Sequence, residues 1–523
     1  MADKTTGEID APLREQFARI IRDVTLSPQQ KCLELARAAE NSLPYAPLDS
    51  ETEAALEARV ICDMYEGHAP YKPRYVLPDY SVVLREGSDY LELPAPTTFD
   101  EALNTLMIAY HHVPSVTGMP VYIGQLDDLL LPFADGVSDA DLHAKLRMFW
   151  RYLDRTLPDA FMHANIGPSD NRVARAILAV DAELKQVAPN LTFRYDPAIS
   201  GEAILRICTD NIITCSKPHI ANHPIHAAVF DAPGYGIVSC YNALPLGGGS
   251  ATLVRMNLAE VAARARSEAE FFAVTLPRYA ALTARLIEAR VARLDESGFF
   301  GSFLVEEGWI SRERFTAMFG IYAMAEAVNR LQDLEGRKGR YGHDAGANAL
   351  GVRISEALSG LVADTPISGI WQGRALLHSQ SGISTDIGYT PGVRIPYGTE
   401  PDPVAHVQAL RGHHAFYTSG VSDILTLDET VRANPAAVFQ LAKGALASGF
   451  REFTANVAGN DLVRVTGFMI RLSDLARYRE GLEVRHGSSL LGAESAERGR
   501  ILERRPRVVA REMLAGEAAL ADA

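Results

Sequence analysis

The sequence contains little cysteine, with five residues in 523, at positions 32, 62, 208, 215 and 240. None of them has the Cys-x-x-Cys spacing that structural zinc sites and iron–sulfur sites use. This excludes those metal sites and a disulfide framework, and it predicts a reducing, cytoplasmic location.

Excess positive charge and long apolar runs are also lacking. Lys and Arg number 51 against 65 Asp and Glu, which leaves a formal net charge of −14. Nucleic-acid surfaces need clustered cations, so we expect no nucleic-acid partner. No run of about eighteen apolar residues occurs, and the first residues lack the apolar centre of a signal peptide, so we expect no membrane association.

Helical and strand patterns alternate along the chain. Apolar residues recur at helical spacing over the first seventy residues, and short strand-like runs follow at 191–195 and 236–238. The same analysis predicts long helices at 252–275, 278–295, 311–332 and 346–363. Such alternation favours an α/β fold with a parallel core and helices outside.

Near the C-terminus, Arg464-Val465-Thr466-Gly467-Phe468 reads as a strand with a glycine in its middle. Glycine weakens a strand, so it usually serves a purpose there. One purpose is a bulge or a tight bend. The other is chemical, because the α-carbon of glycine can lose a hydrogen atom and leave a planar radical that no side chain obstructs.

Cys240 lies in a second unusual setting, between the apolar run 236–238 and Leu246-Gly247-Gly248-Gly249-Ser250. We read the run as a strand and the glycines as a flexible hinge before a helix near Thr252. A cysteine at such a strand end can project into a cavity. A buried structural cysteine is the alternative, since cysteine is among the most buried residue types.

Together these two segments resemble the signatures of the glycyl radical enzymes. The family pattern Arg-Val-x-Gly followed by Tyr or Phe fits 464–468, and 234–250 is similar to the family's cysteine loop. Two further stretches, 123–133 and 217–223, resemble family segments that precede the cysteine loop. Length and the Ser-Cys-Tyr-Asn and Gly-Gly-Gly elements most resemble the YjjI-type branch.

The resemblance implies a fold and a domain organisation. Glycyl radical enzymes form a ten-stranded α/β barrel built from two five-stranded half-sheets. On this chain the resemblance implies an N-terminal helical region at 1–95, a barrel at 96–480 and a C-terminal tail at 481–523. The barrel would contain the cysteine loop at 234–250 and the glycyl radical loop at 460–475.

The resemblance also implies a mechanism. Gly467 would store a radical, and Cys240 would become a thiyl that takes a hydrogen atom from a small-molecule substrate under anaerobic conditions, so that a C–C or C–X bond breaks or the substrate rearranges. Arg464 and Phe468 would support the radical loop. No metal or organic cofactor would be needed in this chain, while a separate S-adenosylmethionine-dependent iron–sulfur activase would install the radical. A homodimer is compatible with the resemblance.

Departures from the family pattern leave the reaction open. Ser239 precedes Cys240 where the formate-lyase branch has a second cysteine, so acyl transfer by that route is not expected. Asn242 takes the place of the glutamate base of the eliminating members.

Other acid–base and binding groups must then be sought upstream. We expect His219, Asn222, His223 and Asn242 to bind substrate, and we consider His219, His223 and His226 as general acids or bases. Surface or turn histidines around Pro218 and Pro224 are the alternative.

Three other functions stay open at this point. Anaerobic ribonucleotide reduction is disfavoured, because the chain has no cysteine after 240 for the zinc site of those enzymes. A radical-less paralogue could act in binding or regulation. Cys240 could also be an ordinary nucleophile with a nearby histidine. The sequence does not indicate the substrate.

Overall fold

The computed structural model describes residues 10–63, 72–115, 121–157, 161–380, 386, 388–465, 467–489, 493 and 507. Its strands are β1 (Ile61–Asp63), β2 (Tyr75–Leu77), β3 (Tyr122–Gln125), β4 (His163–Ile166), β5 (Asn190–Tyr195), β6 (His219–Asn222), β7 (Tyr235–Val238), β8 (Asn242–Pro245), β9 (Gly248–Asn257), β10 (Phe315–Tyr322), β11 (Leu376–Ser379), β12 (Leu425–Leu427), β13 (Glu452–Phe453), β14 (Ala455–Val457), β15 (Leu462–Arg464) and β16 (Met469–Arg471).

Its helices are α1 (Ala11–Arg22), α2 (Pro28–Glu40), α3 (Ser50–Glu57), α4 (Tyr80–Glu86), α5 (Phe99–Tyr110), α6 (Leu126–Leu130), α7 (Asp139–Thr156), α8 (Arg172–Leu184), α9 (Gly201–Cys215), α10 (His223–Ala227), α11 (Leu258–Ala263), α12 (Glu268–Glu270), α13 (Leu276–Glu296), α14 (Phe303–Glu306), α15 (Met324–Leu334), α16 (Ala345–Asp364), α17 (Pro403–Leu410), α18 (Pro435–Ala447) and α19 (Leu472–Arg479). Most of the predicted C-terminal tail lies outside the described residues.

Two five-stranded sheets form the centre of the molecule. In one sheet the order is β13-β6-β5-β4-β3, with β3 to β6 parallel and β13 antiparallel at the edge. In the other, β9, β10 and β11 are parallel, and β1 and β2 both pair with β9 in the antiparallel sense. The α/β class is therefore confirmed. No ladder joins the two sheets within the described residues, so closure into one ten-stranded barrel stays a prediction.

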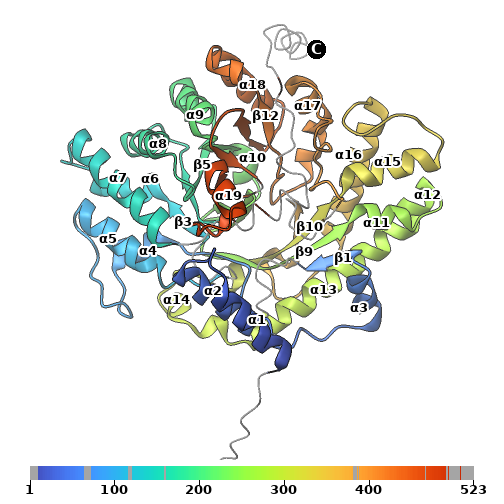
Figure 1. Cartoon of the computed structure of the whole chain (residues 1–523), viewed down its shortest axis with the longest axis horizontal. Coiled ribbons are helices and arrows are strands. Elements are labelled where there is room, and N and C mark those ends of the chain that lie inside the picture. Colours follow the sequence, from blue (N-terminus) through green and yellow to red (C-terminus); the bar gives the residue numbers. More distant parts are fainter. Residues whose placement is uncertain are drawn as a thin grey trace, which may run out of the picture.

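Helices surround the two sheets, as Figure 1 shows. Helices α5, α7, α8 and α9 lie on the side of β3 and β5, and α11, α13, α15 and α16 lie on the side of β9 and β10. The predicted helices at 278–295 and 346–363 correspond to α13 and α16. Each outer helix buries one apolar face, which in α7 consists of Leu142, Leu146, Phe149, Trp150 and Leu153.

The predicted helix at 252–275 is wrong at its start, and so is the hinge before it. Residues 248–257 form β9, which is buried along its whole length, and 315–322 form β10 where a helix had also been expected. Neither segment alternates apolar and polar residues over its whole length, so neither shows the two-residue period that distinguishes a half-buried strand from a buried helix. A methyl group on Gly248 or Gly249 would collide with the carbonyl oxygen of Arg314 or of Tyr75. These glycines therefore permit close backbone packing rather than flexibility.

The N-terminal region contributes more than helices. Helices α1, α2 and α3 confirm the helical pattern of the first seventy residues, but β1 and β2 add two strands to the sheet of β9. This sheet therefore contains strands from both sides of residue 95, the expected end of the N-terminal region.

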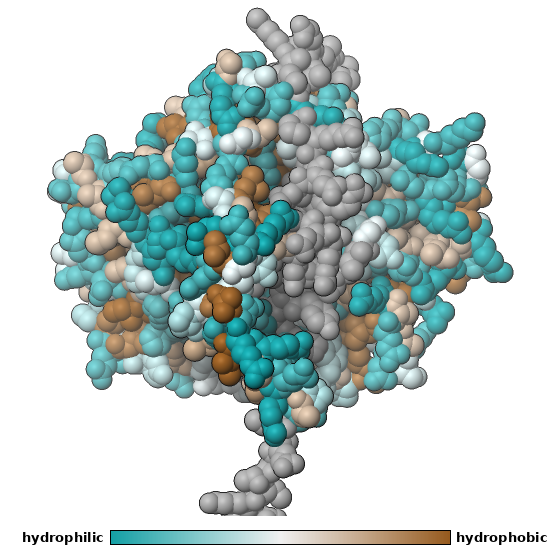
Figure 2. Space-filling model, in the orientation of Figure 1, coloured by the Kyte–Doolittle hydropathy of each residue, from teal (hydrophilic) through white to brown (hydrophobic). Residues whose placement is uncertain are grey.

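The surface is mostly hydrophilic, and Figure 2 shows apolar residues scattered over the visible face. Among the described residues, no helix combines the length and the apolar character that a membrane span requires.

We predict that Gly248→Ala destabilises the fold, because its methyl group would meet the Arg314 backbone inside a buried sheet. Overpacking of this kind costs about 1–3 kcal/mol of unfolding free energy. Gly360→Ala is the control: Gly360 is exposed in α16 with open space around it, and Ala should stabilise that helix by about 1 kcal/mol. Chemical denaturation measures both variants, and equal stability of the two would contradict the packing argument.

Candidate active site

Cys240 lies at the tip of a hairpin formed by β7 and β8. Val238 pairs with Asn242, which leaves Ser239, Cys240 and Tyr241 as the turn. Ser239 and Tyr241 both have left-handed backbones, with φ of 50° and 67°. Such conformations cost about 1–3 kcal/mol each in residues other than glycine and concentrate at functional sites. The backbone is thus strained on both sides of Cys240. The cysteine itself is buried, with 3% of its surface exposed.

This cysteine hairpin, residues 235–245, lies between the two sheets. Strand β7 contacts β3 and β4, whereas β8 contacts β9 and β10. The Asn165 side chain bonds both the N–H and the carbonyl of Ile237, each at 2.8 Å, and Arg194 donates to the carbonyl of Tyr235. Side chains of one sheet therefore satisfy backbone groups of a buried hairpin edge, which would otherwise have no partner.

Gly467 lies at the end of a second hairpin, formed by β15 and β16. It is buried, and a methyl group built on it would collide with Sγ, N and Cα of Cys240. The two residues that the sequence singled out are thus in direct contact. The absence of a side chain at Gly467 is what allows this approach.

A buried hydrogen-bond network holds this glycine hairpin, residues 462–471. The Arg464 guanidinium donates to Asn190 Oδ1 at 2.7 Å and to the Ser216 carbonyl at 3.2 Å. Asn190 Nδ2 in turn donates to the Gly467 carbonyl at 2.9 Å. Asn456 bonds the N–H and the carbonyl of Arg464 at 2.8 and 2.7 Å. Sequence reasoning missed both asparagines, because neither lies in a motif and only the fold brings them to the glycine.

The apolar side of the glycine hairpin is also packed. The Phe468 ring meets the Phe161 ring edge to face, with centroids 5.3 Å apart. Cys215 packs with Leu462 and Met469 of the hairpin, and its thiol donates to the Asn211 carbonyl at 3.3 Å. Cys215 is therefore held in α9, away from the hairpin tip, and burial raises its pKa to about 12.

Two histidines adjoin the cysteine tip. The His219 ring stacks on the Tyr241 ring with centroids 4.0 Å apart. The Thr192 hydroxyl lies between His219 Nδ1, at 2.9 Å, and His163 Nε2, at 2.7 Å. Burial lowers the pKa of both histidines well below the ordinary value, and the positive charge of Arg464 adds to this. Both rings are therefore neutral at neutral pH, so His219 is not a protonated acid there.

The other residues predicted to bind substrate occupy varied positions. Asn222 Nδ2 donates to the carbonyls of Leu446 and Phe450, which ties β6 to the end of α18. Asn242 Nδ2 donates across the cysteine hairpin to the Val238 carbonyl at 3.1 Å, while its Oδ1 is buried and has no partner among the residues that the structure describes. The Asn222 amide group thus connects β6 to the end of α18 through its hydrogen bonds, whereas Asn242 has one side-chain acceptor available for a ligand.

The remaining histidines lie near the base of the cysteine hairpin. His223 Nδ1 is 2.9 Å from the Tyr235 hydroxyl. His226 is fully buried, with Nε2 at 3.0 Å from Oε1 of Glu452, a carboxylate that sequence reasoning did not identify. Burial is the largest cause of the lowered pKa of both histidines.

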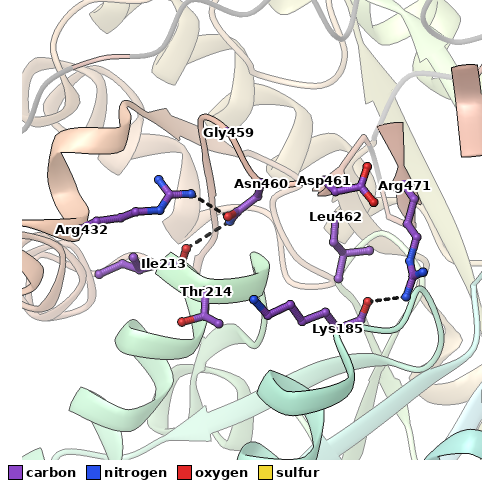
Figure 3. A pocket seen from close by; sticks show the side chains of 9 residues that line it. All are labelled: Lys185, Ile213, Thr214, Arg432, Gly459, Asn460, Asp461, Leu462 and Arg471. Atoms are coloured by element: carbon purple, nitrogen blue, oxygen red, sulfur yellow. Dashed lines mark hydrogen bonds between the residues drawn. The ribbon is translucent and has the colours of Figure 1, made fainter. Parts of the chain in front are cut away.

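A polar cavity of about 670 Å³ opens at the outer end of the glycine hairpin (Figure 3). Leu462 and Arg471, the outermost pair of the hairpin, both line it. Arg471 donates to the Lys185 carbonyl at 2.9 Å, and Asn460 donates to the Ile213 carbonyl at 3.1 Å. The hairpin is therefore held tightly at Gly467, whereas its outer end borders open space.

Comparisons with known proteins agree with this geometry. The sequence profile of the family described as "Glycyl radical enzyme YjjI-like" matches residues 26–507. The chain belongs to this family of glycyl radical enzymes. Its sequence is 57% identical to the protein YjjI of Escherichia coli K12 over 503 residues, which cover 96% of this chain and 97% of YjjI.

Solved structures show the same fold at low sequence identity. Hydroxyproline dehydratase from Clostridioides difficile matches with a TM-score of 0.67 and 11% identity, over 94% of this chain and 88% of the dehydratase. The B12-independent glycerol dehydratase from Clostridium butyricum gives a TM-score of 0.67 and 11% identity, over 95% and 88% of the two chains. The mixed α/β architecture of this YjjI-like protein is thus that of the glycyl radical enzymes, which carry their radical on a glycine of the chain.

We predict that Asn190→Ala loosens the glycine hairpin, because Arg464 and the Gly467 carbonyl lose the amide they share. Leaving buried groups without partners costs about 1–3 kcal/mol of unfolding free energy. Hydrogen exchange of peptides covering 460–475 should become faster. Asn211→Ala, which removes a buried amide bonded to the Leu178 carbonyl, is the control and should leave that exchange unchanged. Equal exchange in the two variants would show that Asn190 does not hold the hairpin.

Proposed function

We propose that Gly467 stores the radical of this enzyme and that Cys240 relays it to a small-molecule substrate. The observation that carries the proposal is the direct contact between the Gly467 α-carbon region and the Cys240 thiol. Hydrogen-atom transfer needs the reacting atoms at contact distance. The two hairpins bring Cys240 and Gly467 to this distance although the two residues are far apart in the sequence.

The transfers balance in atoms and electrons. Cys240 gives the hydrogen atom of its S–H bond to the Gly467 α-carbon, so a C–H bond forms and the unpaired electron moves to sulfur. The sulfur then takes a hydrogen atom from a C–H bond of the substrate, and the substrate radical breaks a C–C or C–X bond or rearranges. The product radical takes the hydrogen atom back from Cys240, and the reverse transfer restores the radical at Gly467.

Burial supports this chemistry. Cys240 and Gly467 are both buried, so water and oxygen have little access to either radical position. Arg464 and Asn190 hold the glycine carbonyl, and Phe468 fills the apolar side of the loop. Their proposed role is to keep Gly467 against Cys240 rather than to contact substrate.

The proposal includes a partner and leaves the type of bond cleavage open. The family generally depends on a radical S-adenosylmethionine iron–sulfur activase, and we propose that such an enzyme abstracts the first hydrogen atom from Gly467. We expect lyase chemistry, carried out under anaerobic conditions in a reducing compartment. We retain His219, Asn222, His223 and Asn242 as proposed substrate-binding residues.

We predict that the anaerobically activated protein gives a glycine-centred doublet in electron paramagnetic resonance, split by the α-hydrogen that remains on Gly467. Gly467→Ala should give no such signal, whereas Gly301→Ala, with open space around it, should keep it. Because an Ala at 467 also collides with Cys240, protein labelled with α-deuterated glycine provides a second test. Its doublet should collapse, and an unchanged splitting would assign the radical to another residue.

We predict that Cys240→Ser accepts the radical at Gly467 but turns over no substrate, because an O–H bond is too strong to give its hydrogen atom to the glycine. Cys208→Ser and Cys215→Ser are the controls and should retain substantial activity, since both cysteines are buried in α9. Spin quantification and a turnover assay on the same samples separate the two effects. Turnover by Cys240→Ser would move the relay to a different residue.

A further inference from the structure

A polar wall faces the cysteine hairpin from the second sheet. Arg255 of β9, Gly320 of β10 and His378 of β11 are register partners and lie in one row across the three strands. The opposite face of this sheet is covered by helices, since Phe319 and Ala375 border a small apolar cavity with residues of α13. The row therefore points away from the outer helices and toward the space between the sheets.

His378 is directly connected to the cysteine hairpin. The Ser419 carbonyl accepts hydrogen bonds from both His378 Nδ1, at 3.0 Å, and the N–H of Ala243, at 3.0 Å. Ala243 lies three residues after Cys240 in β8. The imidazole thus lies against the strand that follows the reactive cysteine.

The hydrogen bond to Ser419 determines which nitrogen of His378 carries the proton. A carbonyl oxygen can only accept, so Nδ1 is the protonated nitrogen. Burial lowers the pKa of His378 to about 3, against the opposing effect of the Ser419 and Gly420 carbonyls, so the ring is neutral at working pH. Nε2 therefore presents a lone pair, and this buried atom has no hydrogen-bond partner among the described residues.

Two side-chain amides on the adjoining chain segments are also unsatisfied within the described residues. Gln380 lies two residues after His378 and is 0% exposed, and neither its Oε1 nor its Nε2 has a hydrogen-bond partner in the part of the chain that the structure describes. Asn242 Oδ1, next to the cysteine tip, is likewise buried and has no partner in the described ranges. A buried polar group without a partner costs about 1–3 kcal/mol, so several on adjoining segments point to a ligand that supplies the missing hydrogen bonds.

The charge of the wall limits what this ligand can be. Arg255 is the one charged side chain in the described strands β9, β10 and β11, and Asp386 binds it in a bidentate ion pair at 2.6 and 3.1 Å. The pair is neutral as a whole, so it attracts an anion weakly. The unsatisfied atoms of His378 and Asn242 are acceptors, and the Gln380 amide adds one acceptor and donors. Hydroxyl groups match this set, because each can both donate and accept.

We propose that His378 Nε2, the Gln380 amide and Asn242 Oδ1 bind the hydroxyl groups of a neutral, hydroxyl-bearing substrate beside Cys240. This inference rests on the proposed function for the identity of Cys240 as the relay. It can nevertheless fail independently, because binding can be measured on protein that carries no radical.

The test compares matched neutral and acidic probes by isothermal titration calorimetry. Glycerol and erythritol should bind the full chain, whereas glycerate and erythronate, with the same carbon skeletons but one carboxylate, should bind at least tenfold more weakly. Gln380→Met should weaken polyol binding at least tenfold. It should also keep or raise the melting temperature, because an apolar side chain of similar shape replaces an unsatisfied amide.

Gln332→Met is the matched control, since Gln332 is a buried glutamine in α15, and it should leave polyol binding unchanged. His378→Ala should weaken polyol binding in the same way as Gln380→Met. The proposal is overturned if the acids bind as well as the polyols, if neither polyol binds the parent protein, or if Gln380→Met binds polyols like the parent. Failure of the protein to form a radical at Gly467, with polyol binding intact, would instead contradict the proposed function and not this inference.

Discussion

The contact between Gly467 and Cys240 is the constraint on which the rest of the structure depends. Any side chain at position 467 would occupy the space of the thiol. The two backbone segments come this close because the tips of the cysteine hairpin and of the glycine hairpin meet. The fold holds one of them from β4 and β5 and the other through Asn190. The left-handed residues on both sides of Cys240 are a local cost that the surrounding packing offsets.

Burial determines the electrostatics of the same region. His163, His219 and His378 lie near the cysteine hairpin, and desolvation lowers the pKa of each. Rings that stay neutral act as fixed donors and acceptors rather than as proton stores. Such a setting suits radical chemistry, in which hydrogen atoms rather than protons move between carbon and sulfur, because it adds no mobile charge beside the reacting atoms.

The two ends of the glycine hairpin have different surroundings. Its inner end is held by the Arg464 and Asn190 network, whereas its outer pair, Leu462 and Arg471, borders a cavity of about 670 Å³. Local stability in proteins follows the density of buried contacts. The inner end is thus the part of the hairpin that the rest of the protein positions most strongly.

The sequence by itself predicted the α/β class, the outer helices α13 and α16, and the two motifs that contain Gly467 and Cys240. Amphipathic helices such as α13 carry a 3.6-residue period, and the two motifs are local runs of residues. Tertiary structure alone decided that 248–257 and 315–322 are strands, because neither segment alternates apolar and polar residues over its whole length and so neither shows a clear two-residue period. It alone also brought Asn190, Asn456 and Glu452 to the site and left Gln380 unsatisfied. Asn190 and Glu452 acquire a role only from partners hundreds of residues away, and no local pattern records such a contact.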